Sequence, residues 1–124
     1  MLSINYKDPR PIYEQVRDAL RQLILSGAIA PGEKLPSVRE LAASLAINPN
    51  TIQRSYRELE SLGLINTVPG KGAFAATDHT AAQRRTQELT DTLAAAVQEL
   101  KLLGVSREDV LAAADAAYGK EEQA

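Results

Sequence analysis

Several polar side chains at the start of a predicted helix could bond to nucleic acid. Asn50, Thr51, Gln53 and Arg54 fall in the first turns of that helix, opposite its apolar positions. Asn and Gln can bond bidentately to adenine, and Thr suits a phosphate or a thymine methyl group. The residue types therefore fit a recognition helix whose N-terminal residues meet base edges. An ordinary solvated polar face would have the same composition.

Other candidates lie before and after this helix. Arg39 occupies the first turn of a preceding helix, within reach of a phosphate or a base edge. Ser37 could cap that helix and touch a phosphate, because a helix N-terminus attracts anions. Lys71 lies between Gly70 and Gly72, and glycines allow a backbone to approach the minor groove closely. The simpler alternatives are a solvated arginine, a cap alone and an ordinary turn.

Capping signals locate the two helices that carry these residues. Ser37 lies three residues before Glu40, which is the spacing of a capping box. Asn48 followed by Pro49 marks a second start, because Asn caps first-turn amides and Pro lacks the N–H that would need a partner. Apolar residues then recur at helical spacing on both helices: Leu41, Ala42 and Leu45, and Ile52, Tyr56 and Leu59. We expect these two faces to pack together across a tight turn.

A hairpin and a supporting helix complete the expected domain. Gly63 provides a left-handed end to the second helix. Leu64–Ile65 and Ala73–Ala75 then predict short strands on either side of the turn at 69–72. Upstream, a helix opens at Pro11 and ends at 26–27, with its apolar residues on one face. Residues 1–76 therefore predict a winged helix-turn-helix, a mainly α fold with a small β wing.

This order of motifs resembles the GntR family of bacterial transcription regulators over about residues 12–74. The segment at 8–15 and the short C-terminal part resemble its YtrA-type subfamily, which has about two helices after the DNA-binding half. The resemblance implies that Arg39 contacts a base and that Lys71 sits at a DNA-contacting wing tip. The chain departs from many members at Gln53, where they have Arg, and at Pro49, where they have a polar or basic residue.

Residues 77–124 predict a helical dimerisation region. The segment 81–103 reads as one helix of about 23 residues, roughly 35 Å long. Apolar residues along it are spaced four, three, four and three apart, as in a heptad seam: Leu89, Leu93, Ala96, Leu100 and Leu103. Gly104 ends this helix, and Ser106 with Asp109 caps another. Because such a seam needs a partner, we expect a homodimer.

Composition excludes several classes of protein. The 124 residues contain no Cys and only His79 among imidazoles, so we expect no disulfide, metal site or cofactor. No base is placed next to Ser37, and Glu58 and Glu60 are interpreted as surface carboxylates, so we expect no enzyme. No run of about 18 apolar residues exists, which predicts a soluble, cytoplasmic protein. Two helices are too few to enclose a metabolite, so we expect no dedicated ligand domain for a small-molecule effector; a ligand between subunits is the alternative.

Charge is divided along the chain. The net charge of −2 and the pI of about 5.4 argue against a nucleic-acid binder. However, residues 1–76 hold nine Lys and Arg against seven Asp and Glu, whereas residues 77–124 hold five against nine. DNA responds to the local field of the docking face. We therefore predict a homodimeric regulator, most simply a repressor, of a palindromic DNA operator; the alternative is a winged-helix module that binds protein.

Overall fold

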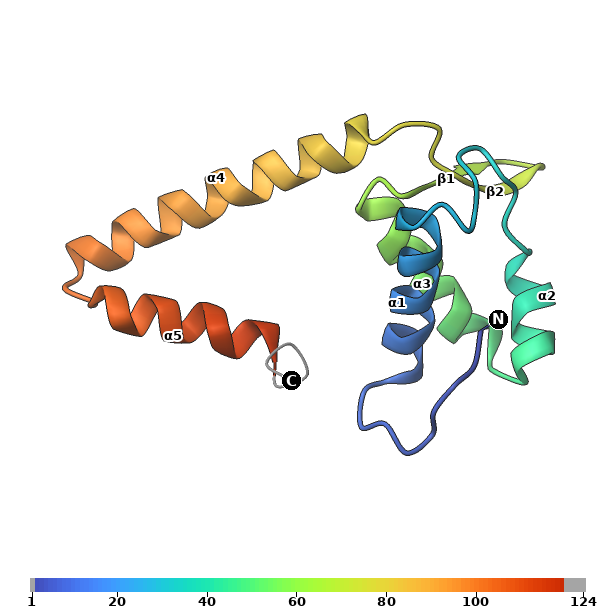
Figure 1. Cartoon of the computed structure of the whole chain (residues 1–124), viewed down its shortest axis with the longest axis horizontal. Coiled ribbons are helices and arrows are strands. Elements are labelled where there is room, and N and C mark those ends of the chain that lie inside the picture. The colour runs from blue at the N-terminus through green and yellow to red at the C-terminus, as the bar shows by residue number, and fades with distance from the viewer. Residues whose placement is uncertain (1, 120–124) are drawn as a thin grey trace. The chain divides into compact units, whose positions relative to one another are not determined.

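The computed structural model describes residues 2–119 and contains five helices and two strands within them (Figure 1). The elements are α1 (Ile12–Leu25), α2 (Val38–Leu45), α3 (Pro49–Ser61), β1 (Ile65–Val68), β2 (Gly72–Ala75), α4 (Thr80–Leu102) and α5 (Arg107–Tyr118). The predicted fold class is confirmed. The chain divides into two compact units within α4, after Arg85. The functional division after residue 76 stays a prediction.

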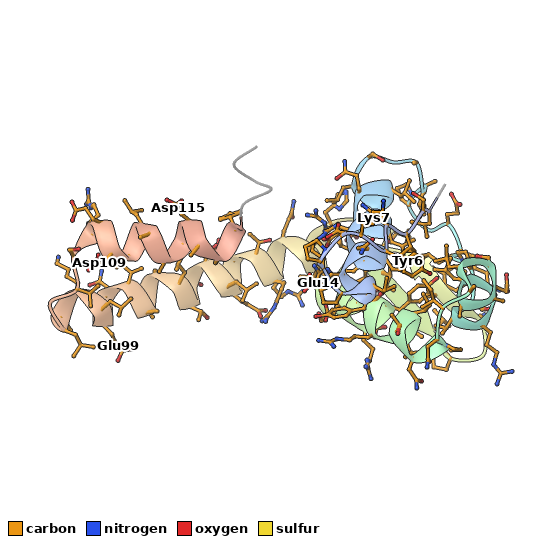
Figure 2. The ribbon with its side chains drawn as sticks, turned by 90° about the horizontal axis from the view of Figure 1, so that it is seen from below. Tyr6, Lys7, Glu14, Glu99, Asp109 and Asp115 are labelled. Carbon is orange, nitrogen blue, oxygen red and sulfur yellow. The ribbon has the colours of Figure 1, made fainter. Side chains whose placement is uncertain are left out.

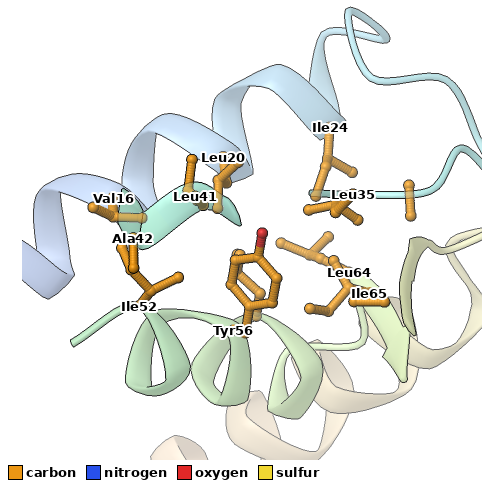
Figure 3. Packing of buried hydrophobic residues seen from close by; sticks show 13 residues of the cluster. Val16, Leu20, Ile24, Leu35, Leu41, Ala42, Ile52, Tyr56, Leu64 and Ile65 are labelled. Carbon is orange, nitrogen blue, oxygen red and sulfur yellow. The ribbon is translucent and has the colours of Figure 1, made fainter. Parts of the chain in front are cut away.

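The core of the first unit lies between α1, α2, α3 and the wing. Figure 3 shows the Tyr56 ring among the apolar side chains of these elements. Val16 and Leu20 from α1 meet Ile52 and Leu59 from α3, and all four are almost completely buried. The buried residues of α3 recur at three- and four-residue spacing, which puts them on one face of the helix.

Side-chain caps begin the helices where the sequence predicts them. The Ser37 Oγ accepts a hydrogen bond from the Glu40 N–H at 3.0 Å, and the Asn48 Oδ1 accepts one from the Asn50 N–H at 2.8 Å. The turn between α2 and α3 has an unpredicted feature. Ala46 adopts a left-handed conformation with φ of 56°, although a residue with a Cβ atom is disfavoured there.

The wing is an antiparallel hairpin extended by a third segment. β1 pairs with β2 so that Ile65 lies opposite Ala75 and Val68 lies opposite Gly72. The first strand thus begins one residue later than predicted and runs on to Val68, because pairing continues to the turn. The 34–35 segment lies along the hairpin: the Leu35 N–H donates to the Ala73 carbonyl at 2.8 Å.

Gly63 lies where the end of α3 packs against the start of α4. Its φ of +77° lets the chain turn, as predicted, and the Leu64 N–H donates back to the Leu59 carbonyl at 3.0 Å. A Cβ atom on Gly63 would lie only 2.7 Å from the Ala82 nitrogen and 2.8 Å from the Ala81 carbonyl carbon. The first turn of α4 therefore packs against backbone that only glycine can provide.

We predict that Gly63→Ala destabilises the protein more than Gly27→Ala. Gly27 follows α1 with a similar φ of +85°, but a Cβ atom there would meet nothing within 4 Å. Gly27→Ala should therefore cost only the left-handed penalty of about 1 to 2 kcal/mol. Gly63→Ala carries the same penalty and must also displace the start of α4. Thermal and urea unfolding of both variants measures the difference, and equal losses would contradict the packing described for α4.

Candidate nucleic-acid interface

Tyr56 fixes the start of α2 against α3. Its ring is buried, as predicted for a core residue, and its hydroxyl donates to the Pro36 carbonyl at 2.7 Å. Burial, helped by the negative charge of Glu40, raises the pKa of Tyr56 to about 12. The phenol therefore keeps its proton, and its hydrogen bond, throughout the physiological pH range. This bond positions the first turn of α2, which carries two of the candidate residues.

Those two residues, Ser37 and Arg39, are both exposed at the start of α2. The Ser37 oxygen is used as the helix cap. Its hydroxyl hydrogen can still be donated to an acceptor outside the protein, since a serine donates and accepts at the same time. Arg39 lies one residue into the helix, with its side chain exposed to solvent. A phosphate or base contact by either residue stays a prediction.

The N-terminal half of α3 presents most of the predicted residues to solvent. Asn50, Gln53 and Arg54 are exposed, whereas Thr51 is half-buried. Thr51 lies beside the buried face because it is four residues from the buried Ser55, one helical turn away on the same side. The outward position that the sequence predicts for Thr51 is therefore only partly present.

Arg54 lies on the edge of α3 that faces α1. Its guanidinium carbon is 3.6 Å from the centroid of the Tyr13 ring, and one of its nitrogens donates to the Tyr13 hydroxyl at 2.9 Å. Glu58 bonds to Arg17 of α1 at 2.7 Å and approaches Arg54 at 3.5 Å. Glu58 thus lies at the surface, as interpreted, and helix packing also brings Arg17 to it.

Another part of the exposed surface of α3 faces the start of α2 and the wing. Gln53, Arg57 and Glu60 line a cleft of about 170 Å³ there, together with Ser37 and Thr67. The Glu60 Oε2 accepts a hydrogen bond from the Thr67 N–H at 3.1 Å, which attaches the wing to α3. Glu60 is exposed, as interpreted from the sequence, and also has this partner. Arg57 was not predicted as a site residue. It follows Gln53 by four residues, and this spacing indicates that the two side chains lie on the same side of the helix.

Gly70 and Lys71 lie exposed in the wing turn, as the sequence predicts. Gly70 has a φ of +76°, and the Lys71 N–H closes the turn on the Val68 carbonyl at 2.9 Å. Gly72 has a φ of +116°, and the Lys34 Cε lies 3.1 Å from where its Cβ would be. Lys34 thus brings a second cation to the wing. Lys34 was not among the candidate residues.

The predicted seam lies on the second unit, and each of its side chains is exposed to solvent in the described part of the chain. The exposed fractions of Leu89, Leu93, Leu100 and Leu103 range from 36% to 79%, and Ala96 is exposed too. α5 runs back in the opposite direction to α4 (Figure 1).

A hollow of about 660 Å³ lies along the two helices of this unit. Its lining is mainly apolar, with two cations: Leu93, Val97, Lys101, Val105, Arg107, Val110, Leu111 and Ala114. Leu93 is the only seam residue in that lining, and the exposed fractions show that the rest of the stripe is not covered by α5. Figure 2 shows side chains along both helices, with Glu99, Asp109 and Asp115 labelled on this unit.

Two other kinds of site are absent from the described part of the chain. Residues 2–119 contain no helix that is long and apolar enough to cross a membrane. They also contain no group of three or more His, Asp or Glu side chains that could hold a metal ion.

Comparisons with known proteins agree with this geometry. The family model described as "Bacterial regulatory proteins, gntR family" matches residues 12–75. The uncharacterized HTH-type transcriptional regulator YhcF of Bacillus subtilis is 38% identical over 107 residues, which cover 86% of this chain and 88% of YhcF. The HTH-type transcriptional repressor YtrA of the same organism is 46% identical over 74 residues, which cover 60% of this chain and 57% of YtrA.

A solved structure adds a relative bound to DNA. The AraR DNA-binding domain in complex with the operator ORE1 has a TM-score of 0.53 and 30% sequence identity, covering 61% of this chain and 93% of that domain. The predicted resemblance to GntR regulators, and to YtrA among them, is thus confirmed. The matched residues are those that build the helix-turn-helix and the wing. The family members named here are regulators and not enzymes. The chain belongs to the GntR family of bacterial transcription regulators.

Proposed function

We propose that this chain is a cytoplasmic repressor that binds a palindromic operator as a homodimer. The observation that carries the proposal is the exposure, on one winged unit, of side chains suited to DNA at the start of α2, along α3 and at the wing tip. We assign DNA contact to Ser37, Arg39, Asn50, Thr51, Gln53, Gly70 and Lys71. Arg54 is not assigned to DNA, because Tyr13 and Glu58 already hold its guanidinium.

The role of repressor is supported by relatives that carry that name. YtrA of Bacillus subtilis is a transcriptional repressor, and the Klebsiella aerogenes histidine utilization repressor is 40% identical over 68 residues of this chain. The operator-bound AraR domain supports DNA as the partner. A two-fold dimer would read two half-sites in opposite orientation, which is why we propose a palindrome.

The homodimer is supported by the exposed leucines of the second unit. Burying one leucine side chain contributes roughly 1.5 to 3 kcal/mol, so an uncovered stripe of four is a strong driving force for association. We propose that a second copy covers this stripe and fills the hollow along α4 and α5. The hollow is open along the described chain, so we propose no dedicated metabolite site and no effector there.

A module that binds protein through its winged fold is the alternative. The acidic net charge and the presence of Gln53 favour it. A salt titration of binding to a random duplex separates the two functions, because phosphate neutralisation makes log affinity fall linearly with log salt. Selection of bound sites from randomised DNA then gives the operator. The proposal fails if binding is independent of salt and no sequence is enriched.

We predict different effects for Arg39→Ala and Lys71→Ala. Arg39→Ala should cost about 1 to 3 kcal/mol on the selected operator and relax the preference for one base, because a reading contact is lost. Lys71→Ala should weaken selected and random DNA alike and reduce the salt slope by about one, because a phosphate contact is lost. Fluorescence anisotropy with both duplexes measures each effect. Equal losses on both duplexes for Arg39→Ala would remove it as a base-reading residue.

We also predict that the double variant Leu93→Asp and Leu100→Asp is a monomer. Two carboxylates in the stripe would oppose burial, while the residue 1–76 domain keeps its own core. Operator affinity should then fall to that of a single half-site, since dimerisation links two weak contacts. Sedimentation and operator titration of the full chain measure both effects.

The control for this double variant is Gln87→Asp with Gln98→Asp, which adds the same charge to α4 at exposed positions outside the stripe. This control should remain dimeric. A parent protein that sediments as a monomer at micromolar concentration, with and without DNA, would overturn both the dimer and the palindromic operator.

A further inference from the structure

Arg54 and Arg57 lie three residues apart on the exposed face of α3, but their side chains have different neighbours. Arg54 faces α1, where the Tyr13 ring and Glu58 hold it. Arg57 faces the start of α2 and the wing, where it lines the cleft of about 170 Å³. The two arginines are therefore placed for different tasks.

Arg54 already has partners within the protein, on the side of its guanidinium that faces α1. Its guanidinium lies over the Tyr13 ring, donates to the Tyr13 hydroxyl at 2.9 Å and approaches Glu58 at 3.5 Å. Glu58 in turn bonds to Arg17 at 2.7 Å, so Arg54 belongs to a network that joins α1 to α3. Moving Arg54 to a phosphate would break these contacts.

Arg57 is exposed, and no hydrogen bond or ion pair joins its guanidinium to another residue in the described chain. The neighbouring carboxylate, Glu60, accepts the Thr67 N–H instead. Five N–H donors of a permanently charged group thus remain available at the mouth of the cleft. Uncharged polar groups of Ser37, Gln53 and Thr67 line the same cleft.

We propose that Arg57 contacts a phosphate of the DNA backbone in the cleft between α3 and the wing. This inference rests on the proposed DNA-binding function. A helix in the major groove and a wing at the adjacent minor groove are separated by a sugar–phosphate strand, so a cation between them meets that strand. Arg57 takes the phosphate-neutralising role on α3 that Gln53, which has no charge, cannot supply.

Glu60 lines the same cleft, and its substitution should change the affinity for DNA in the opposite direction to substitution of Arg57. Its carboxylate repels a phosphate held by Arg57, since like charges at close range are unfavourable. Gln in its place can still accept the Thr67 N–H through its amide oxygen and so keep the wing attached. Glu60→Gln should therefore strengthen DNA binding, whereas Arg57→Gln should weaken it.

The experiment measures the affinity of the full chain for a short duplex of random sequence over a range of salt concentrations. Arg57→Gln should lower the affinity and reduce the slope of log affinity against log salt by about one. The matched control is Arg21→Gln, which removes the same charge from an exposed position on α1. Arg21→Gln should leave the slope unchanged. Arg54→Gln should lower the melting temperature and leave the slope unchanged.

The inference is overturned if Arg57→Gln has the parent slope, or if Arg54→Gln alone reduces it. It is also overturned if Glu60→Gln binds more weakly than the parent while its melting temperature is unchanged. In each of these cases the parent protein still binds DNA, so the proposed function stands. A parent protein without salt-dependent binding would instead remove the proposed function, and the phosphate site with it.

Discussion

The packing of α3 is the constraint on which the rest of the winged unit depends. Three of its residues reach three different neighbours: the Ser55 hydroxyl donates to the Tyr13 carbonyl of α1, the Tyr56 hydroxyl to the Pro36 carbonyl before α2, and Glu60 accepts the Thr67 N–H of the wing. The apolar residues between them fill the core. Ser55 and Tyr56 are buried, and a buried polar group without a partner is costly, so their two bonds leave little freedom for other arrangements of α1, α2 and α3.

Features set by neighbouring residues were predicted from the sequence. The caps at Ser37 and Asn48 depend on a side chain and an amide two or three residues away, so the residue types suffice to identify them. The packing of α4 on Gly63 depends on residues about twenty positions apart in the sequence. No pattern in a single sequence indicates a contact between residues so far apart. Ala46 in a left-handed turn was missed for a related reason: the core and the fixed helix ends impose that conformation on a residue that does not favour it.

The candidate site was predicted in its residue types and less well in its surroundings. Helical periodicity separates the buried face of α3 from its exposed face, and the exposed face contains Asn50, Gln53 and Arg54 as expected. Periodicity does not tell which neighbour each edge of that face will meet. Tyr13 lies 41 residues from Arg54, and only the packing of α1 on α3 brings them together. For the same reason Arg57 and Lys34 were overlooked as charges near the wing.

The acidic charge of the C-terminal part of the chain has a consequence for how a DNA-binding regulator searches a chromosome. Residues 77–124 hold five Lys and Arg against nine Asp and Glu, and Glu99, Asp109 and Asp115 are exposed (Figure 2). A genome offers about 10⁶ to 10⁹ competing non-specific sites, which retain a strongly basic protein. Negative charge outside the reading surface weakens this retention without altering any base contact. The same few copies then spend less time on bulk DNA, and the occupancy of a target site can respond faster to changes in protein concentration.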